Sequence, residues 1–384
     1  MSVSRSTGSG LFLFAAIAMM VVSMFLWSGC DRQQDSPSSG AVDRSVPVLD
    51  KENAQVMSVM ALQTRYTDDL MADPNVVGTA TGLAPDGRLA IMVYLKEEPK
   101  TQVKGRGIFA AGIPPEIQGV PVVTEVTGAF RAMRKGGGGG VSHTAKQTAP
   151  VQLGTSGGWR YDLANGYCCG GTLGSLVQKG GSQYVLSNYH VFWADIVSGG
   201  NNRTAQAGDF VIQPGLIDVG CNAANAQNVA TLSGSGSLPG ANVDAGYAQV
   251  IPGMVRTDGA ILEVGTLSSS TVAASLKKAV KKSGRTTGLT RSTVSGLNAT
   301  ISVRYDNECA GGVAFTKTFT GQIVIANRGS RFLNSGDSGS LMVEDITTKP
   351  RAVGLLYAGS STLAIANPIN DVLNWIGGAT MVGN

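Results

Sequence analysis

The 384-residue chain is poor in histidine and in charged residues. Its only histidines are His143 and His190, so a multi-histidine metal site is nearly excluded and imidazole catalysis has two candidates. Charged residues make up 15% of the chain, whereas globular chains average about 25%. The net charge is +4, and no block of five or six basic residues occurs. The composition therefore argues against a nucleic-acid-binding protein.

Glycine, by contrast, is abundant. It accounts for 52 of the 384 residues, about twice its usual share. Hydrophobic residues make up 43% of the chain, which is normal for a folded core. Ample apolar residues with little charge argue against general disorder. The length favours two domains.

The N-terminus has the features of a targeting segment. Residues 11–27 are apolar except for Ser23 and follow one basic residue, Arg5. This pattern indicates a signal sequence or a short membrane anchor over residues 1–30. The stretch ends in Leu-Trp-Ser-Gly-Cys, which resembles a bacterial lipobox with Cys30 as the lipidated residue, although Trp27 departs from the pattern. We expect a lipid-anchored protein of the bacterial cell envelope, with an uncleaved anchor or plain secretion as alternatives.

The cysteines suit an oxidising compartment. Besides Cys30 the chain has four, namely Cys168, Cys169, Cys221 and Cys309. They allow two disulfides in three connectivities, and buried free thiols are the alternative. Adjacent cysteines rarely bond each other, so we expect separate partners for Cys168 and Cys169. No Cys-x-x-Cys pair supports zinc, and we expect neither a metal nor a cofactor.

A polar tether over residues 31–50, rich in Ser, Gln, Asp and Pro, leads to a first folded region at 51–133. Its patterns predict one helix and three strands, at 52–72, 76–81, 89–96 and 120–127. The turn Pro85-Asp86-Gly87 predicts a hairpin between the first two strands. This small α+β module carries no catalytic constellation. We interpret it either as a pro-segment that occupies a cleft or as a separate targeting or partner-binding domain.

Residues 134–152 form the predicted linker. Five consecutive glycines at 136–140 cannot hold regular structure cheaply. His143 follows them, and we expect it to be an exposed linker residue without a catalytic role.

The region 153–384 shows short apolar runs separated by Gly, Asn, Ser and Asp, a pattern typical of an all-β barrel or sandwich. The end of the chain, from Pro368, predicts a helix. A basic cluster at 277–282 is interpreted as a solvated face, with contact to an anionic surface as the alternative. The predicted strands lie at 172–178, 184–187, 209–212, 245–251, 321–326, 340–344 and 352–357.

The strongest chemical motif is Gly336-Asp337-Ser338-Gly339-Ser340. A serine hydroxyl is a weak nucleophile until a base takes its proton. The flanking glycines allow a sharp turn that exposes the hydroxyl and lets backbone N–H groups converge on an oxyanion. Ser338 is therefore the candidate nucleophile.

A base and an orienting acid precede this motif in the chain. His190 follows the apolar strand that ends at Ser187, and it is the only imidazole in the second region. Asp244 heads another apolar strand, and such a carboxylate can fix the tautomer of the histidine and stabilise the imidazolium. Asp209 and Asp218 are the main alternatives to Asp244, with less weight on Asp195, Asp258 and Asp306.

The order His190, Asp244, Ser338 resembles that of the chymotrypsin/trypsin-like serine peptidases of the PA clan, nearest to the bacterial streptogrisin and α-lytic branch. Residues 169–173 resemble the opening strand of that family, 283–288 a strand and turn of that branch, and 367–375 its closing helix. The resemblance covers about 153–384. It implies an all-β catalytic domain of two antiparallel six-stranded β-barrels with a C-terminal helix and the triad between the barrels. It also implies an oxyanion hole from the N–H groups of Gly336 and Ser338.

The chain departs from the family in three places. Val191 stands where a disulfide-forming cysteine often follows the catalytic histidine, and no Ile-Val-Gly-Gly-like activation site occurs. We therefore expect Asp337 to make a local hydrogen bond or ion pair. By resemblance, Phe332, Leu333, Tyr357 and Gly359 belong to the specificity pocket, which has no acid in the matching stretch. This argues against cleavage after Lys or Arg and for small or apolar residues.

These inferences predict a serine endopeptidase, a hydrolase that cleaves a protein or peptide substrate through an acyl-enzyme. His190 would act as general base and then general acid, Ser338 as nucleophile and Asp244 as orienting carboxylate. The alternative is a catalytically inactive relative that uses the same fold as a binding module. The expected partners are the substrate and, through the N-terminal anchor, a membrane.

Overall fold

The computed structural model describes residues 47–98, 112–132, 142–164, 167–193, 203–305 and 314–384. All the described residues belong to one compact unit, Pro47–Asn384. The predicted leader with Cys30, the glycine run and Cys309 lie outside the described residues. Within the described ranges, no helix is both long enough and apolar enough to span a membrane.

The first elements form the predicted helix and hairpin. Helix α1 (Ala54–Met71) begins after Asn53, whose side chain accepts hydrogen bonds from two backbone N–H groups of the first turn. Strands β1 (Val76–Leu83) and β2 (Leu89–Leu95) pair antiparallel around the predicted turn. Strand β4 (Val120–Val126) runs parallel to β2, and the short β3 (Glu116–Ile117) pairs with β4. Apolar residues of α1 and of these strands share one core.

This module shares a sheet with the rest of the chain. Strand β1 pairs antiparallel with β18 (Gly288–Tyr305), with Gly78 opposite Ile301. A Cβ at Gly78 would lie 2.6 Å from the Ile301 side chain, so glycine permits the close approach. Strand β5 (Phe130–Ala132) pairs with β18 and with β21 (Ala352–Gly359). The linker at 134–152 stays a prediction. The strands before and after it nevertheless pair with each other, β1 with β18 and β5 with β21.

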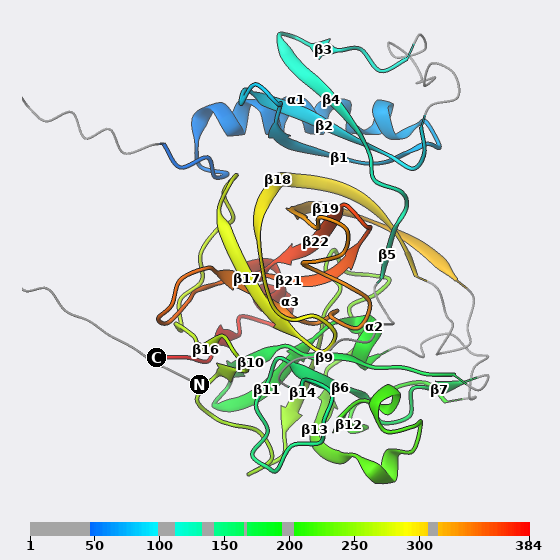
Figure 1. Cartoon of the computed structure of the whole chain (residues 1–384), viewed down its shortest axis with the longest axis vertical. Helices are drawn as coiled ribbons and strands as arrows, with labels where there is room; N and C mark the ends of the chain where they lie inside the picture. The colour runs from blue at the N-terminus through cyan, green and yellow to red at the C-terminus, as the bar shows by residue number, and fades with distance from the viewer. Residues whose placement is uncertain (1–46, 99–111, 133–141, 165–166, 194–202, 306–313) are drawn as a thin grey trace, which may run out of the picture. The chain divides into compact units, whose positions relative to one another are not determined.

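Six strands of the C-terminal half pair antiparallel in the order β17, β20, β21, β22, β19, β18, and β17 also pairs with β18. The bounds not yet given are β17 (Ala279–Gly284), β20 (Leu341–Glu344), β22 (Leu363–Pro368) and β19 (Phe315–Ala326). Helix α3 (Ile369–Trp375) follows β22 directly, with Pro368 as its N-cap residue, as the sequence predicted. Figure 1 shows these strands curling around a shared interior.

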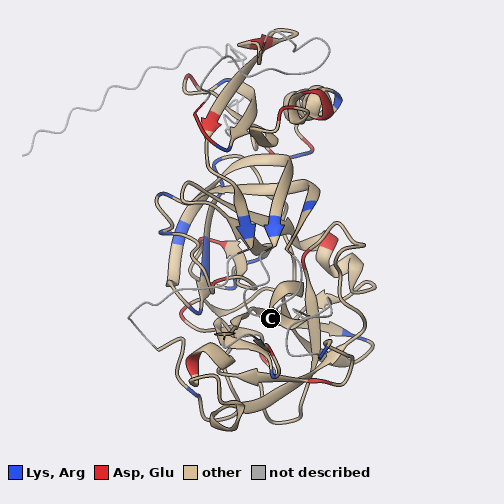
Figure 2. Ribbon diagram, turned by 90° about the vertical axis from the view of Figure 1, so that its right-hand side faces the viewer, with Lys and Arg blue, Asp and Glu red and all other residues tan. Residues whose placement is uncertain are grey.

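An eight-stranded sheet has the order β23, β10, β11, β14, β13, β12, β6, β9. Its strands are β6 (Thr155–Trp159), β9 (Gly171–Leu173), β10 (Ser175–Lys179), β11 (Ser182–Ser187), β12 (Phe210–Gln213), β13 (Gln227–Ser233), β14 (Gly246–Val250) and β23 (Thr380–Met381). The described chain is thus mostly β, with curled sheets that resemble the expected double-barrel fold. Most of the ribbon in Figure 2 is neither basic nor acidic, consistent with the low charge content.

Smaller elements complete the described chain. Helix α2 (Tyr189–Phe192) follows β11, and the 3₁₀ turns η2 (Leu216–Asp218) and η3 (Ala223–Asn225) follow β12. Two short ribbons pair β7 (Leu163–Ala164) with β8 (Tyr167–Cys168) and β15 (Ala260–Ile261) with β16 (Gly265–Thr266).

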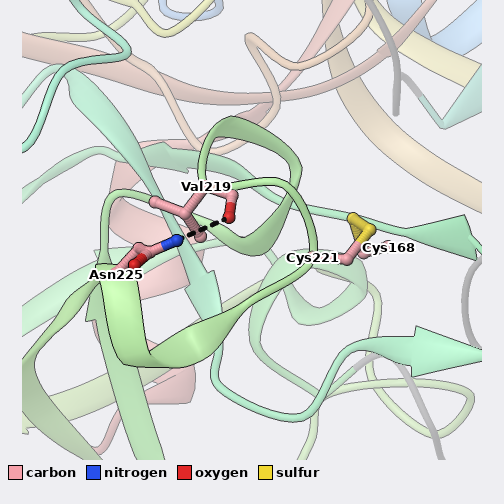
Figure 3. Close-up of a disulfide and its surroundings, with 4 residues drawn as sticks. All are labelled: Cys168, Val219, Cys221 and Asn225. Carbon is pink, nitrogen blue, oxygen red and sulfur yellow. Dashed lines mark hydrogen bonds between the residues drawn. A yellow bond between two sulfur atoms is a disulfide. The ribbon is translucent and has the colours of Figure 1, made fainter.

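A disulfide joins Cys168 to Cys221, which lies between η2 and η3 (Figure 3). Beside it, the Asn225 side chain donates to the Val219 carbonyl at 3.4 Å. Cys169 is also disulfide-bonded. Because Cys168 pairs with Cys221, the adjacent cysteines do not bond each other, as expected.

The expectation of an exposed His143 is wrong. Its side chain is 6% exposed, and its Nε2 lies 3.0 Å from Ser283 Oγ and 3.1 Å from Glu263 Oε2. The neighbouring glycine run suggested a solvated linker, but the carbonyl of His143 accepts a hydrogen bond from Ser156 at the start of β6. This backbone contact holds the residue against the folded chain.

Candidate active site

The histidine and the aspartate are brought together by strand pairing. Strands β11 and β14 pair with Ser187 opposite Gly246, so the residues just beyond these two positions meet. His190 Nδ1 lies 2.6 Å from Asp244 Oδ2, and the His190 backbone N–H lies 3.4 Å from Oδ1. The two side chains are 2% and 0% exposed. A carboxylate at this nitrogen fixes the tautomer that leaves Nε2 as the base.

The backbone of Asp244 is held from two elements. Its N–H donates to Asn367 Oδ1 at 3.1 Å, and its carbonyl accepts from Asn367 Nδ2 at 3.2 Å. The same carbonyl accepts from Asn188 Nδ2 at 2.8 Å. Asn367 belongs to β22 and Asn188 directly follows β11, so both curled sheets fix the position of the aspartate. Sequence reasoning missed these two asparagines, because a lone Asn carries no local signal for such a role.

A tyrosine provides a further contact to the carboxylate. Tyr305 Oη donates to Asp244 Oδ2 at 2.8 Å. Burial, and secondly the nearby Asp244 charge, raise the pKa of Tyr305 well above its usual value. The phenol therefore stays protonated and acts as a donor.

The two alternative acids are engaged elsewhere. Asp209 pairs with Arg203 at 2.8 Å and accepts from Trp159 Nε1 at 3.1 Å. Asp218 pairs with Arg285. Asp244 is therefore the carboxylate that the described structure brings to His190.

Ser338 lies in a loop whose conformation requires glycine at two positions. Gly336 and Gly339 have φ of +95° and +90°, which L side chains rarely adopt. A Cβ at Gly336 would collide with Thr286 Oγ1, and one at Gly339 would collide with Ser187 Oγ. The glycine requirement inferred from the motif thus has a steric origin.

The predicted opening strand holds this loop in place. The Thr172 N–H donates to the Ser338 carbonyl at 2.8 Å, and Thr172 Oγ1 donates to the Gly336 carbonyl at 3.0 Å. The Ser338 side chain is fully buried, and its Oγ donates to the Tyr357 carbonyl at 3.3 Å. The oxyanion role of the Gly336 and Ser338 N–H groups remains a prediction.

Asp337 makes the local contacts that the sequence predicted. It accepts hydrogen bonds from the backbone N–H groups of Thr286, Thr287 and Asn334 at 2.9, 3.0 and 3.0 Å. Its carboxylate also lies 3.3 Å from Lys282 Nζ. Burial lowers the pKa of Lys282, and Asp337 opposes that effect.

The basic cluster at 277–282 is not a uniformly solvated face, contrary to expectation. Lys281 and Lys282 are 5% and 0% exposed. Lys281 Nζ donates to the Ile346 carbonyl at 2.7 Å, and Lys282 faces Asp337. The charge run was misleading because Lys281 and Lys282 lie in β17, where every residue after Ala279 is buried, so both side chains pack within the folded chain.

The residues assigned to the pocket are all buried. Phe332 and Leu333 pack in one apolar cluster, and Tyr357 packs in another, with its ring centroid 5.0 Å from that of Phe319. Gly359 lies opposite Ala364 of β22 and opposite Arg131 of β5. Their assignment to a specificity pocket remains a prediction.

Part of the chain matches a known family. Residues 243–378 match the family described as the Nal1 C-terminal domain, a range that includes Asp244 and Ser338 but not His190. No curated protein matches the chain.

Several solved structures share its fold at low identity. A glutamic-acid-specific serine protease is 20% identical, over 60% of this chain and 100% of that one, with a TM-score of 0.40. Protease A of Thermobifida fusca is 20% identical over 61% and 99%, with a TM-score of 0.40. The chymotrypsin of Cellulomonas bogoriensis is 20% identical over the same shares, with a TM-score of 0.36. The chain is similar in structure to bacterial chymotrypsin-like serine proteases over about 60% of its length.

Proposed function

We propose that the chain is a serine endopeptidase in which His190, Asp244 and Ser338 form the triad. The observation that carries the proposal is the 2.6 Å contact between His190 Nδ1 and Asp244 Oδ2, with both side chains buried. A buried imidazole with a carboxylate on one nitrogen is the arrangement that prepares a general base.

In this reaction, His190 takes the Ser338 hydroxyl proton through Nε2 while Ser338 Oγ attacks the substrate carbonyl. The proton then passes from His190 to the leaving amine, and an acyl-enzyme remains. Water deprotonated by His190 releases the acid product and regenerates the serine. Asp244 stabilises the imidazolium at each stage, and the N–H groups of Gly336 and Ser338 are proposed to hold the oxyanion.

The membrane and compartment assignments also belong to the proposal. The leader pattern at 11–27 and Cys30 support a lipid-anchored enzyme of the bacterial cell envelope. The disulfide between Cys168 and Cys221 agrees with an oxidising compartment. We expect the substrate to be a protein or peptide cleaved after a small or apolar residue.

We further propose that the module at 51–133 acts as a pro-segment. Its last described strand, β5, pairs antiparallel with β21, with Ala132 opposite Ala358. The next residue back along β21 is Tyr357, whose carbonyl accepts the hydrogen bond from Ser338. A strand at this place covers the backbone beside the nucleophile, which agrees with the buried Ser338 side chain. The alternative of a partner-binding domain predicts no effect of β5 on the reactivity of Ser338.

One observation favours a second candidate function. The complete burial of Ser338 suits a non-catalytic relative that uses the fold for binding. Peptidase activity on a broad peptide library separates the two. The endopeptidase proposal predicts cleavage by Ala132→Pro, in which the strand beside the nucleophile is weakened, and its loss when Ser338→Ala or His190→Gln is added. Equal background cleavage in all three proteins would favour the binding module.

A further inference from the structure

Asp244 uses one carboxylate oxygen for two donors. Oδ2 lies 2.6 Å from His190 Nδ1 and 2.8 Å from Tyr305 Oη. The carboxylate is fully buried, so solvent does not supply the second hydrogen bond. Tyr305 therefore takes a place that water would take at an exposed carboxylate.

The tyrosine ring is fixed before any substrate arrives. Tyr305 is the last residue of β18 and lies opposite Phe315, the first residue of β19. Their rings stack with centroids 4.8 Å apart and planes 8° from parallel. The Tyr305 ring also meets His190, with centroids 5.9 Å apart and an interplanar angle of 63°. This packing directs the Tyr305 hydroxyl toward Asp244 and places the Tyr305 ring beside the His190 imidazole.

We propose that Tyr305 is a positioning residue of the triad, which acts through Asp244 on the basicity and orientation of His190. The inference rests on the proposed function. Its hydroxyl disperses part of the carboxylate charge, so the imidazolium is stabilised less than it would be by Asp244 alone. The same hydrogen bond restrains the carboxylate in the orientation in which Oδ2 meets His190 Nδ1.

The test compares Tyr305→Phe with the wild-type full chain. The variant keeps the stacked ring and removes only the hydroxyl. We expect the rate of Ser338 labelling by a fluorophosphonate at neutral pH to fall about tenfold, as for loss of a hydrogen bond to a charged group. We also expect the apparent pKa of the pH–rate profile to rise. Tyr184→Phe is the matched control, because Tyr184 also packs edge-on against an aromatic ring, that of Tyr247. It should leave the labelling rate and the pH–rate profile unchanged.

A double-variant comparison distinguishes positioning from a general packing role. In an Asp244→Asn background, Tyr305→Phe should cause no further loss, because the group through which it acts is gone. An undiminished additional loss in that background would overturn the proposal.

A measurement without catalysis keeps this inference separate from the proposed function. With only two histidines, the imidazole NMR spectrum is simple, and a His143→Gln variant assigns it. The titration of His190 should move to higher pH in Tyr305→Phe and stay in place in Tyr184→Phe. An unchanged titration would overturn the role of Tyr305 even if Ser338 reacts. A shifted titration with an unreactive Ser338 would support Tyr305 and contradict the peptidase proposal.

Discussion

Lys282 Nζ lies 3.3 Å from Asp337 Oδ2, and neither side chain has any exposed surface. The lysine comes from β17, and the aspartate precedes the candidate nucleophile in the chain. Lys282 Nζ also donates to Thr287 Oγ1 and to the Gly288 carbonyl, so the turn after β17 provides further hydrogen-bond acceptors for the ammonium group. The cation that pairs with Asp337 is thus supplied within the folded chain, without a newly cut N-terminus.

Replacing Lys282 with methionine should leave Asp337 as an unpaired buried charge. Loss of one partner from a buried ion pair costs about 3–5 kcal/mol, so we expect a loss of that size in the free energy of unfolding. Ser338 labelling should fall with it. Lys278→Met is the control, because Lys278 is 19% exposed and lies 3.4 Å from Glu344. Denaturant unfolding curves give the free energy of unfolding of each variant. Equal losses of that free energy in the two variants would refute the structural role of Lys282.

Gly336→Ala should abolish labelling of Ser338. The added methyl group meets Thr286 Oγ1 and must also adopt a φ of +95°. Gly321→Ala is the matched control, because φ there is +70° but nothing lies within 4 Å of the added Cβ. The control should lose about 1 kcal/mol of stability from the positive φ alone and keep its reactivity. Similar labelling rates in the two variants would rule out the steric account of this loop.

The unfolding free energy should depend on alkaline pH through Tyr357. Burial, and secondly the Asp244 charge, raise the pKa of Tyr357 well above its usual value of 10.0. The unfolded chain loses this proton near that pH while the folded chain keeps it, so stability is full below about pH 10 and falls as the pH rises beyond it. In Tyr357→Phe the slope above about pH 10 should be shallower by up to about 1.4 kcal/mol per pH unit. Parallel stability curves of the two proteins through the alkaline range would argue against a buried, protonated phenol.

Ala132→Pro should speed the reaction of Ser338 if β5 acts as the end of a pro-segment. Proline removes a backbone donor and disfavours strand pairing, which weakens the contact with β21. A loss of about 1.4 kcal/mol in that contact gives a tenfold larger open population. Glu116→Pro, in the short edge strand β3, is the control and should leave the labelling rate unchanged. An unchanged or lower rate in Ala132→Pro would favour the separate-domain interpretation.

Local patterns predicted much of the fold. The helix at 52–72 and the strands at 76–81 and 89–96 are observed within a few residues of their predicted ends, because caps, turns and alternation are local signals. The longest strand, β18, was missed. It contains Gly296 and Asn298, and its register shifts occur around them. Many of its less buried positions are occupied by threonine, serine and arginine, so no apolar run marks it.

The site was predictable only in part for a related reason. His190 and Ser338 stand out in the sequence because one is a rare residue type and the other lies in a distinctive glycine-flanked motif. Tyr305, Asn367 and Lys282 do not, since each acts through a partner that is far away in the sequence. Tertiary pairing decides their roles, and a single sequence does not reveal which buried tyrosine or lysine meets which carboxylate.

The proposed function depends above all on the activation of Ser338 by His190. The decisive experiment is mass spectrometry of the folded full-length protein after treatment with a fluorophosphonate, on the wild type and on Ala132→Pro. We predict one adduct, mapped to Ser338, which disappears in Ser338→Ala and drops by at least about a thousandfold in rate in His190→Gln. The absence of an adduct from both the wild type and Ala132→Pro, or labelling of Ser338 at the same rate without His190, would overturn the proposed function.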